Sequence, residues 1–191
     1  MNLVPVSIAY QKPKAQSFDE MYMQLAVNMA KLSTCARVQV GAVLVVDERP
    51  LLSGYNGSPR GHRHCTDVFY DRYQESCYEG SFEEFMQLPK IKAEHGVFSR
   101  LHEIHAEVNI IAQAAYKGLA TKKGKLYVTC SPCNDCCKSI LTAGISEVVF
   151  KDLYDRETEG LEILVNSGIK LRQLELIDSK VKENILWQLP Q

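Results

Sequence analysis

The sequence lacks any apolar run long enough to cross a bilayer, and it lacks an excess of charge of either sign. Lys and Arg total 22 against 23 Asp and Glu, which gives a formal net charge of −1. A transmembrane helix needs about 20 predominantly apolar residues, and a protein that grips long nucleic acid by its phosphates needs a basic surface. We therefore expect neither a membrane protein nor a nucleic-acid-binding protein.

A secretory signal and a complete disulfide set are also missing. The short apolar stretch near the N-terminus is broken by Pro5 and has no positive segment before it, unlike a signal peptide. A cytoplasmic location is therefore expected, where clustered cysteines are more often metal ligands than disulfides. The chain has seven cysteines, and an odd number cannot pair completely within one chain. This count points to metal or thiol chemistry.

The length of 191 residues fits one domain, and we find no repeat, low-complexity tract or flexible linker. Residues 1–16 are expected to form an irregular arm, and residues 17–191 a single domain. Within that domain, residues 66–100 are polar and aromatic without a clear period, and we expect a loop insertion with some helical content there.

Helices and strands are expected to alternate along much of the chain. Ser17 and Glu20 have the spacing of a capping box, which predicts that a helix begins at Ser17. A β-branched stretch, 38–46, predicts a strand that pairs with 51–55 in a hairpin, whereas 181–187 is expected to be a short helix. Further helices are expected over 105–116, 132–143 and 161–165, and further strands over 125–129, 148–150 and 169–176. This alternation predicts a layered α/β sheet with some parallel pairing.

Two short segments have the spacing of a catalytic metal site. His105 and Glu107 open one expected helix, and Cys133 and Cys136 lie in the first turn of another. Cysteines three residues apart in a first helical turn can direct both sulfurs at one ion, and the helix N-terminus favours thiolates. With the histidine they make three zinc ligands and leave a fourth position open for water, whose pKa zinc lowers. Glu107 would lie near the ion without binding it, as a proton carrier does; the pattern is the known signature of zinc deaminases.

Other interpretations of these segments are weaker. A lone C-x-x-C is common in redox and structural sites, and a lone H-x-E occurs at many helix starts. The two together, each at an expected helix N-terminus, are far more specific. A structural zinc would be expected to have four protein ligands and would not need Glu107.

The chain resembles the deoxycytidylate (dCMP) deaminases of the cytidine deaminase-like superfamily over about residues 18–174. The resemblance rests on four blocks in order: 40–43 (VGAV), 54–59 (GYNGSP), 104–109 (IHAEVN) and 128–136 (VTCSPCNDC). It implies a three-layer α/β/α fold with a five-stranded mixed sheet and, usually, a homohexamer.

The resemblance also implies the reaction and its residues. His105, Cys133 and Cys136 would bind the catalytic zinc, and Glu107 would carry protons between water, N3 of cytosine and the departing ammonia. The product of this hydrolysis is dUMP, a precursor of thymidylate. Asn56 resembles the asparagine that contacts the substrate sugar in this superfamily.

A phage-type subgroup of these enzymes carries a second zinc, bound by two cysteines, a histidine and a glutamate. The matching positions in this sequence are Cys35, Cys65, His95 and Glu103. In the subgroup this zinc braces the segment before the catalytic helix. From spacing alone the four residues are scattered, and buried cysteines with a surface histidine and glutamate would be the better explanation; the resemblance is what favours a second zinc. Three nearby histidines are competing ligands: His62, His64 and His102.

The negligible net charge favours a free nucleotide over tRNA or DNA strands as substrate. One phosphate needs only one or two cations and some backbone amides, and Arg60 and Arg63 follow the asparagine block. They are phosphate candidates, although solvated loop arginines are an equal alternative. Tyr154 is placed to stack on the base or simply to pack.

Many members of the family are activated by Mg-dCTP and inhibited by dTTP at a site between subunits. The aromatic residue and arginine that help form this site in phage-type members are replaced here by Gln113 and Tyr116, so the resemblance does not carry regulation over. The remaining alternatives are a dCTP or modified-deoxycytidylate deaminase, a more distant tRNA adenosine deaminase, and a non-catalytic zinc-binding assembly module. Three cysteines have no predicted chemical role: Cys77, Cys130 and Cys137.

Overall fold

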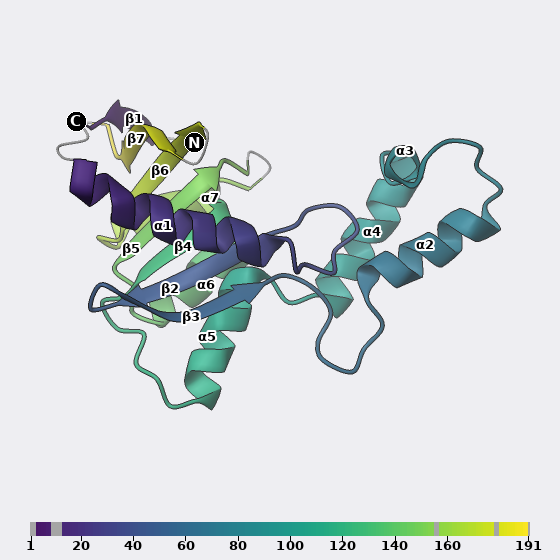
Figure 1. Ribbon diagram of the computed structural model, residues 1–191, viewed down its shortest axis with the longest axis horizontal. Coiled ribbons are helices and arrows are strands. Elements are labelled where there is room, and N and C mark those ends of the chain that lie inside the picture. Colours follow the sequence, from purple (N-terminus) through teal and green to yellow (C-terminus); the bar gives the residue numbers. More distant parts are fainter. Residues whose placement is uncertain (1–2, 9–12, 155–156, 178–179, 191) are drawn as a thin grey trace.

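The computed structural model describes residues 3–8, 13–154, 157–177 and 180–190 (Figure 1). The strands are β1 (Val4–Ser7), β2 (Gly41–Val46), β3 (Arg49–Tyr55), β4 (Lys125–Cys130), β5 (Glu147–Asp152), β6 (Lys170–Ile177) and β7 (Lys180–Gln188). The helices are α1 (Pro13–Ala30), α2 (Cys65–Glu75), α3 (Phe82–Phe85), α4 (Pro89–His102), α5 (Ala106–Tyr116), α6 (Asn134–Thr142) and α7 (Glu159–Asn166). None of the described helices is both long and apolar enough to pass through a membrane.

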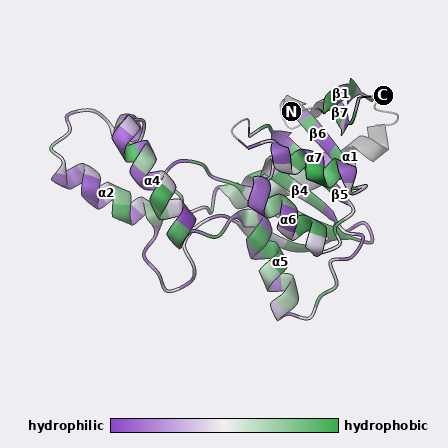
Figure 2. Cartoon of the chain, turned by 180° about the vertical axis from the view of Figure 1, so that it is seen from behind, coloured by the Kyte–Doolittle hydropathy of each residue, from purple (hydrophilic) through white to green (hydrophobic). Residues whose placement is uncertain are grey.

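All seven strands belong to one mixed sheet in the order β1-β7-β6-β5-β4-β2-β3. β5 pairs in parallel with β4 and β6, whereas the other pairings are antiparallel. Side chains of a strand alternate between the two faces, so Leu126 packs in the core with α5, α6 and α7, while Tyr127 packs with α1. The result is the expected three-layer arrangement, with α5 and α6 on the side shown in Figure 2.

The prediction of five strands is wrong, because two more strands extend one edge of the sheet. β1 lies in the stretch expected to be an irregular arm, and β7 covers residues 181–187, which were expected to be helical. Ile185 and Trp187 are two residues apart and both pack in the same core as Leu3, which is strand periodicity. Pairing of β7 with both β6 and β1 overrides the weak helical pattern of this short segment.

Helix α1 begins at Pro13, four residues before the predicted start at Ser17, because proline is well suited to the first turn of a helix. The helix lies very close to β2: a Cβ on Gly41 would stand only 2.0 Å from the carbonyl oxygen of Ala26. Only glycine permits this approach. This close contact fixes the position of the end of α1 relative to β2.

A buried ionic network holds α1 on its face of the sheet. The Arg172 guanidinium donates to Glu147 at 2.6 Å and to the two carboxylate oxygens of Asp19 at 2.9 and 3.1 Å. Tyr127 donates a further hydrogen bond of 2.6 Å to Asp19. Burial would raise the pKa of Asp19, but the hydrogen bonds and charge of Arg172, together with Tyr127, outweigh it and lower this pKa.

The segment 66–100, expected as a loop insertion, contains three helices. Helices α2, α3 and α4 stand apart from the sheet (Figure 1) and share a small core that includes Phe69, Phe85 and Met86. Each of the two longer helices mixes hydrophilic and hydrophobic residues along its length (Figure 2). Their aromatic contacts come from different helices, so no single helix shows a clear apolar period in the sequence.

Candidate active site and second metal cluster

Three predicted zinc ligands meet at the N-termini of α5 and α6. His105 is the N-cap residue of α5, Cys133 is the N-cap residue of α6, and Cys136 lies in the first turn of α6. The Nδ1 atom of His105 lies 3.4 Å from Sγ of Cys133 and 3.3 Å from Sγ of Cys136. We call these three residues the His105 cluster. In a tetrahedral zinc site, nitrogen and sulfur ligands lie about 3.5 Å apart, so the residues fit a zinc ion.

The electrostatics of the His105 cluster also suit a cation. Hydrogen bonds from the Cys136 thiol and from His105 lower the pKa of Cys133 to about 4. Cys133 is therefore a thiolate at neutral pH, which is the form that binds zinc. The N-terminus of α6 adds a favourable dipole. Three ligands leave a fourth zinc position free for water.

Glu107 lies in the first turn of α5, two residues after His105. Its side chain is buried, at 4% exposure, and burial raises its pKa above that of an ordinary glutamate. A raised pKa makes a carboxylate a better proton acceptor and a carboxylic acid easier to keep protonated near neutral pH. Its position and environment both suit a proton carrier.

Asn56 is buried beside β3, and its side-chain amide is held by the segment between α1 and β2. Its Oδ1 accepts hydrogen bonds from the Ser33 hydroxyl at 2.6 Å and from the Val40 N–H at 2.8 Å. Its Nδ2 donates to the Val38 carbonyl at 2.8 Å. These contacts use one of the two Nδ2 hydrogens, so the amide is oriented and still has a hydrogen to donate.

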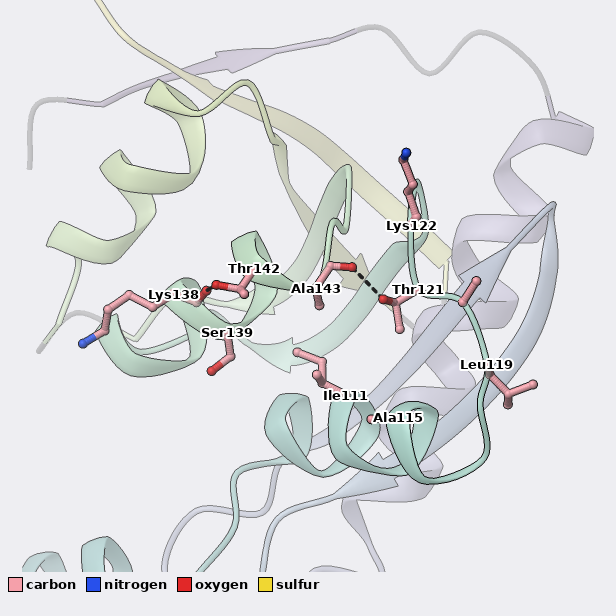
Figure 3. Close-up of a pocket in the computed structure, with 10 residues that line it drawn as sticks. Ile111, Ala115, Leu119, Thr121, Lys122, Lys138, Ser139, Thr142 and Ala143 are labelled. Carbon is pink, nitrogen blue, oxygen red and sulfur yellow. Dashed lines mark hydrogen bonds between the residues drawn. The ribbon is translucent and has the colours of Figure 1, made fainter.

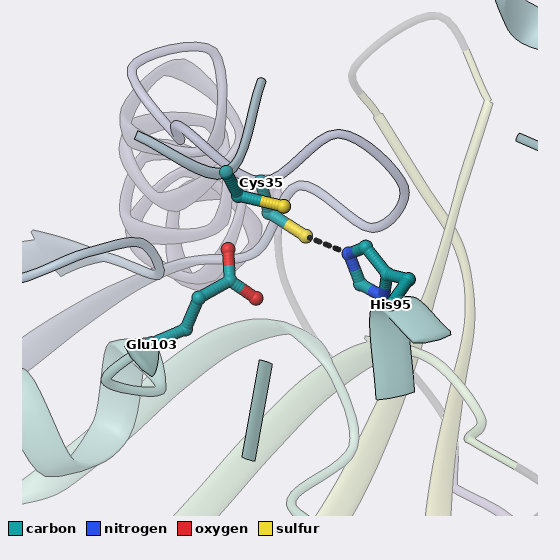
Figure 4. A group of neighbouring side chains, drawn as sticks. Cys35, His95 and Glu103 are labelled. Carbon is teal, nitrogen blue, oxygen red and sulfur yellow. Dashed lines mark hydrogen bonds between the residues drawn. The ribbon is translucent and has the colours of Figure 1, made fainter. Parts of the chain in front are cut away.

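Four further residues form a second group, which we call the Cys35 cluster: Cys35, Cys65, His95 and Glu103. Their ligand atoms all lie within 4.8 Å of one another, and Figure 4 shows the sulfur, imidazole and carboxylate groups pointing toward a common centre. Sγ of Cys35 is 3.3 Å from Nε2 of His95. Two cysteines, a histidine and a carboxylate are a suitable four-ligand set for zinc.

The charges of the Cys35 cluster need a partner. Hydrogen bonds from the Cys65 thiol and from His95 lower the pKa of Cys35 to about 3. Burial raises the pKa of Glu103, and both of its carboxylate oxygens are buried without a hydrogen-bond partner in the described residues. A buried, unpaired carboxylate beside a thiolate is costly, and a cation between them would remove that cost.

The residues predicted to contact the phosphate and the base are less well placed for a substrate role than Asn56. Arg63 is largely exposed and pairs with Asp71 at 2.6 Å on the surface of α2. Arg60 lies exposed in the loop before it. Tyr154 is half-buried, and its backbone N–H donates to the Ser131 hydroxyl at 2.7 Å. The structure therefore leaves the substrate roles of these residues as predictions.

Two residues of the segment that holds Asn56 were not singled out from the sequence. Ser33 bonds the amide directly, and Arg37 immediately precedes Val38, the acceptor of the Asn56 amide. The Nε atom of Arg37 is buried and has no hydrogen-bond partner in the part of the chain that the structure describes. Neither residue belongs to a local motif; the order S-x-C-x-R after a helix is the only signal.

The remaining cysteines and histidines lie outside both clusters. Cys137 is buried and its thiol faces the Pro132 carbonyl at 3.7 Å, as expected for a spectator. His62 and His64 are exposed, and His102 packs on Phe98 with ring centroids 4.7 Å apart. The structure instead places His95 beside Cys35, Cys65 and Glu103.

A surface depression of about 760 Å³ lies at the opposite ends of the catalytic helices (Figure 3). Ile111 and Ala115 of α5 and Thr142 of α6 contribute to its lining. Because His105 and Cys133 lie at the N-termini of these helices, this depression is separate from the His105 cluster.

Comparison with known proteins agrees with this geometry. The profile of the family described as the cytidine and deoxycytidylate deaminase zinc-binding region matches residues 16–152. The deoxycytidylate deaminase of Enterobacteria phage T4 is 33% identical over 78% of this chain and 86% of that protein. ComE operon protein 2 of Bacillus subtilis (strain 168) is 32% identical over 88% of this chain and 79% of that protein.

A solved structure extends the match to three dimensions. The dCMP deaminase from the cyanophage S-TIM5, determined in complex with dCMP and dUMP, aligns with a TM-score of 0.62 and 28% identity. The alignment covers 86% of this chain and all of that one. The family profile, the relatives and the fold agree, and the chain belongs to the cytidine and deoxycytidylate deaminases.

Proposed function

We propose that this protein hydrolyses dCMP to dUMP and ammonia in a zinc-dependent reaction. The observation that carries the proposal is the His105 cluster with Glu107 buried two residues away. Relatives named deoxycytidylate deaminase, and the S-TIM5 enzyme solved with dCMP and dUMP, identify the substrate class. The product is the direct precursor for thymidylate synthesis.

The residues divide the chemistry between them. His105, Cys133 and Cys136 would hold the zinc, which lowers the pKa of a water molecule and so supplies a nucleophile at neutral pH. Glu107 accepts the proton that the attacking water loses and delivers one to N3 of cytosine. Attack on C4 forms a tetrahedral centre, the bond from C4 to the exocyclic nitrogen breaks, and Glu107 helps to protonate the departing ammonia.

The substrate contacts are part of the proposal. Asn56 would donate its remaining Nδ2 hydrogen to the deoxyribose, and Tyr154 would stack on the base. For the phosphate, Arg60 and Arg63 are joined by Arg37, whose buried Nε has no hydrogen-bond partner among the described residues and needs an acceptor. An anionic phosphate is such an acceptor, whereas Arg63 already has Asp71.

The Cys35 cluster would bind a second, structural zinc. Its four-residue ligand set supports this assignment, as do the buried Glu103 oxygens, which have no hydrogen-bond partner within the described part of the chain. The ion would join residues from before β2, from α2, from α4 and from the approach to α5. It would thereby fix helices α2 to α4 relative to the catalytic helix.

Self-association is a further part of the proposal, with a hexamer as the expected form. The depression in Figure 3 has apolar lining residues, and near it Tyr116 is 90% exposed. Large exposed apolar side chains beside a depression are typical of surfaces that a partner covers. Light scattering of the zinc-loaded protein measures the mass, and a monomer would contradict this part.

We also propose that the chain, with β1 as part of its sheet, acts as one deaminase domain in the cytosol, where reduced cysteines are free to bind zinc. The central test measures ammonia release from dCMP, CMP, dCTP and deoxycytidine by the zinc-loaded protein. We expect the highest kcat/KM with dCMP. Preference for dCTP would favour the alternative substrate, and no turnover on any of them would favour a zinc-binding module. Repeating the assay with Mg-dCTP and with dTTP tests for effectors at the site where this chain has Gln113 and Tyr116.

A further inference from the structure

One buried hydroxyl, that of Ser33, joins the Cys35 cluster to the proposed sugar contact. Ser33 follows α1 by three residues and is 8% exposed. Its Oγ lies 2.6 Å from Oδ1 of Asn56 and accepts a hydrogen bond of 3.2 Å from the backbone N–H of Cys35. The proposed chemistry assigns this hydroxyl no task.

The directions of these hydrogen bonds are fixed by what each group can donate. The Ser33 oxygen uses a lone pair to accept from the Cys35 N–H, so its single hydrogen can be donated to Asn56. Within Asn56 the nearer acceptor is Oδ1, at 2.6 Å, compared with 2.9 Å for the backbone oxygen. The Val40 N–H occupies the second lone pair of Oδ1. Because both lone pairs of Oδ1 are occupied by donors, the other end of the amide, Nδ2, faces the Val38 carbonyl. One Nδ2 hydrogen is donated there, and the second is left for a ligand.

The other side of Asn56 is tied to the residues that separate the two clusters. Gly57 donates to the Ile104 carbonyl at 3.1 Å, and Ile104 donates back to Gly57 at 2.9 Å. Ile104 lies between Glu103, a member of the Cys35 cluster, and His105. The asparagine is thus held on both sides by backbone next to metal-cluster residues.

We propose that Ser33 is a positioning residue for nucleotide binding: it orients the Asn56 amide toward the deoxyribose and connects this amide to the Cys35 segment. The inference rests on the proposed function. Ser33 acts through Asn56 and does not itself touch the substrate. Since dCMP has a single free sugar hydroxyl, at the 3′ carbon, this hydroxyl is the acceptor for the oriented Nδ2 hydrogen.

The test is Ser33→Ala, compared with the wild type on dCMP and on 2′,3′-dideoxycytidine monophosphate. A contact made equally in the ground state and the transition state changes KM without changing kcat, and one hydrogen bond corresponds to about a three- to tenfold change. We expect KM for dCMP, and the Kd of dUMP measured by calorimetry, to rise about three- to tenfold. The value of kcat should stay within about twofold. With the dideoxy substrate the two proteins should have equal KM values, and zinc content should not change.

The control is Ser146→Ala, a matched substitution that removes hydroxyl-to-carbonyl hydrogen bonds of 3.0 Å to Lys123 and 3.2 Å to Gly124, outside both clusters and away from Asn56. It should leave both KM values unchanged. If Ser33→Ala does not fold, Ser33→Cys fills the position with a slightly larger side chain that is a weaker donor and should show the same selective rise in KM.

Two results would overturn the positioning role: an unchanged KM for dCMP, or an equal rise with the dideoxy substrate. Failure of the proposed function is distinct, because the wild type itself would then not deaminate dCMP. If the wild type is active and the Ser33 variants bind dUMP as it does, only the positioning role is lost.

Discussion

The two candidate metal clusters of this protein are built in opposite ways. The His105 cluster comes from two helix N-termini and offers three ligands, with Glu107 two residues from His105. The Cys35 cluster takes one residue each from four places between residues 35 and 103, and it includes four protein ligands. The first arrangement suits a reaction, because a ligand position stays open; the second suits bracing, because the protein fills all four.

The largest expected effect comes from replacing Glu107, beside the His105 cluster, and it separates catalysis from metal binding. Glu107→Gln should lower kcat by about 10²- to 10⁴-fold, because a positioned proton carrier contributes that much. Zinc content should match the wild type, since Glu107 is not a ligand. The measurement is steady-state ammonia release together with metal analysis; appreciable remaining activity would remove Glu107 from the mechanism.

The next effect tests whether the Cys35 cluster braces the fold. Cys65→Ser should reduce zinc from two ions per chain to one and lower the free energy of unfolding by about 3 kcal/mol or more, because it leaves buried charges uncompensated. Zinc at the His105 cluster should remain. The matched control is Cys77→Ser, since Cys77 is exposed and outside both clusters. One zinc per chain in the wild type, unchanged in Cys65→Ser, would contradict the second site.

A smaller effect, on KM for dCMP, is expected when two arginines are replaced in turn, one before and one after Asn56 in the sequence. Arg37→Ala should raise KM for dCMP about tenfold or more, because a charged hydrogen bond to phosphate is lost. Arg63→Ala should change KM by less than about twofold, since it removes only an exposed ion pair. Steady-state kinetics with dCMP and with deoxycytidine, which has no phosphate, isolate the effect; the reverse ranking would return the phosphate contact to Arg63.

The smallest effect concerns α1, which leads into Cys35 but not into the His105 cluster. Because the pKa of Asp19 is lowered in the folded protein, its ionic form stabilises the fold at any pH above the ordinary value of 3.8. This stabilisation is lost as the pH falls through 3.8 toward the lower folded pKa. The difference in unfolding free energy between wild type and Asp19→Asn should therefore be full at neutral pH and shrink in acid.

Urea unfolding at a series of pH values measures this difference. The control is Asp135→Asn, because Asp135 forms an exposed pair with Lys138 that solvent screens. A difference for Asp19→Asn that is independent of pH would show that the Arg172 network does not stabilise the ionised carboxylate. In that case the amide hydrogens of α1 should exchange in acid no faster than those of α5 and α6.

Much of the site was predictable because its spacing is local. Cys133 and Cys136 lie within one helical turn. Gly118 and Gly144, both with positive φ, directly follow the C-cap residues of α5 and α6, where glycine commonly ends a helix. The hairpin of β2 and β3 was also predicted, with Asp47 and Glu48 in the left-handed turn between them. These features depend on neighbours a few residues away.

Other features were not predictable from local pattern. β7 was expected to be a helix, and the segment of α2 to α4 a loop insertion with some helical content. The apolar residues of β7 face partners distant along the chain, and those of α2 to α4 face one another across different helices. The orientation of Asn56 depends on Ser33, Val38 and Val40. The sequence pattern around Asn56 does not indicate these contacts.

The sequence by itself determined most of the alternation of helices and strands and the spacing of the His105 cluster, because ligand spacing and helix termini are properties of short segments. Only the tertiary structure decided the seven-stranded sheet, the gathering of Cys35, Cys65, His95 and Glu103, and the link from Ser33 to Asn56. These depend on contacts between segments distant along the chain, which form only when the helices and the sheet pack together.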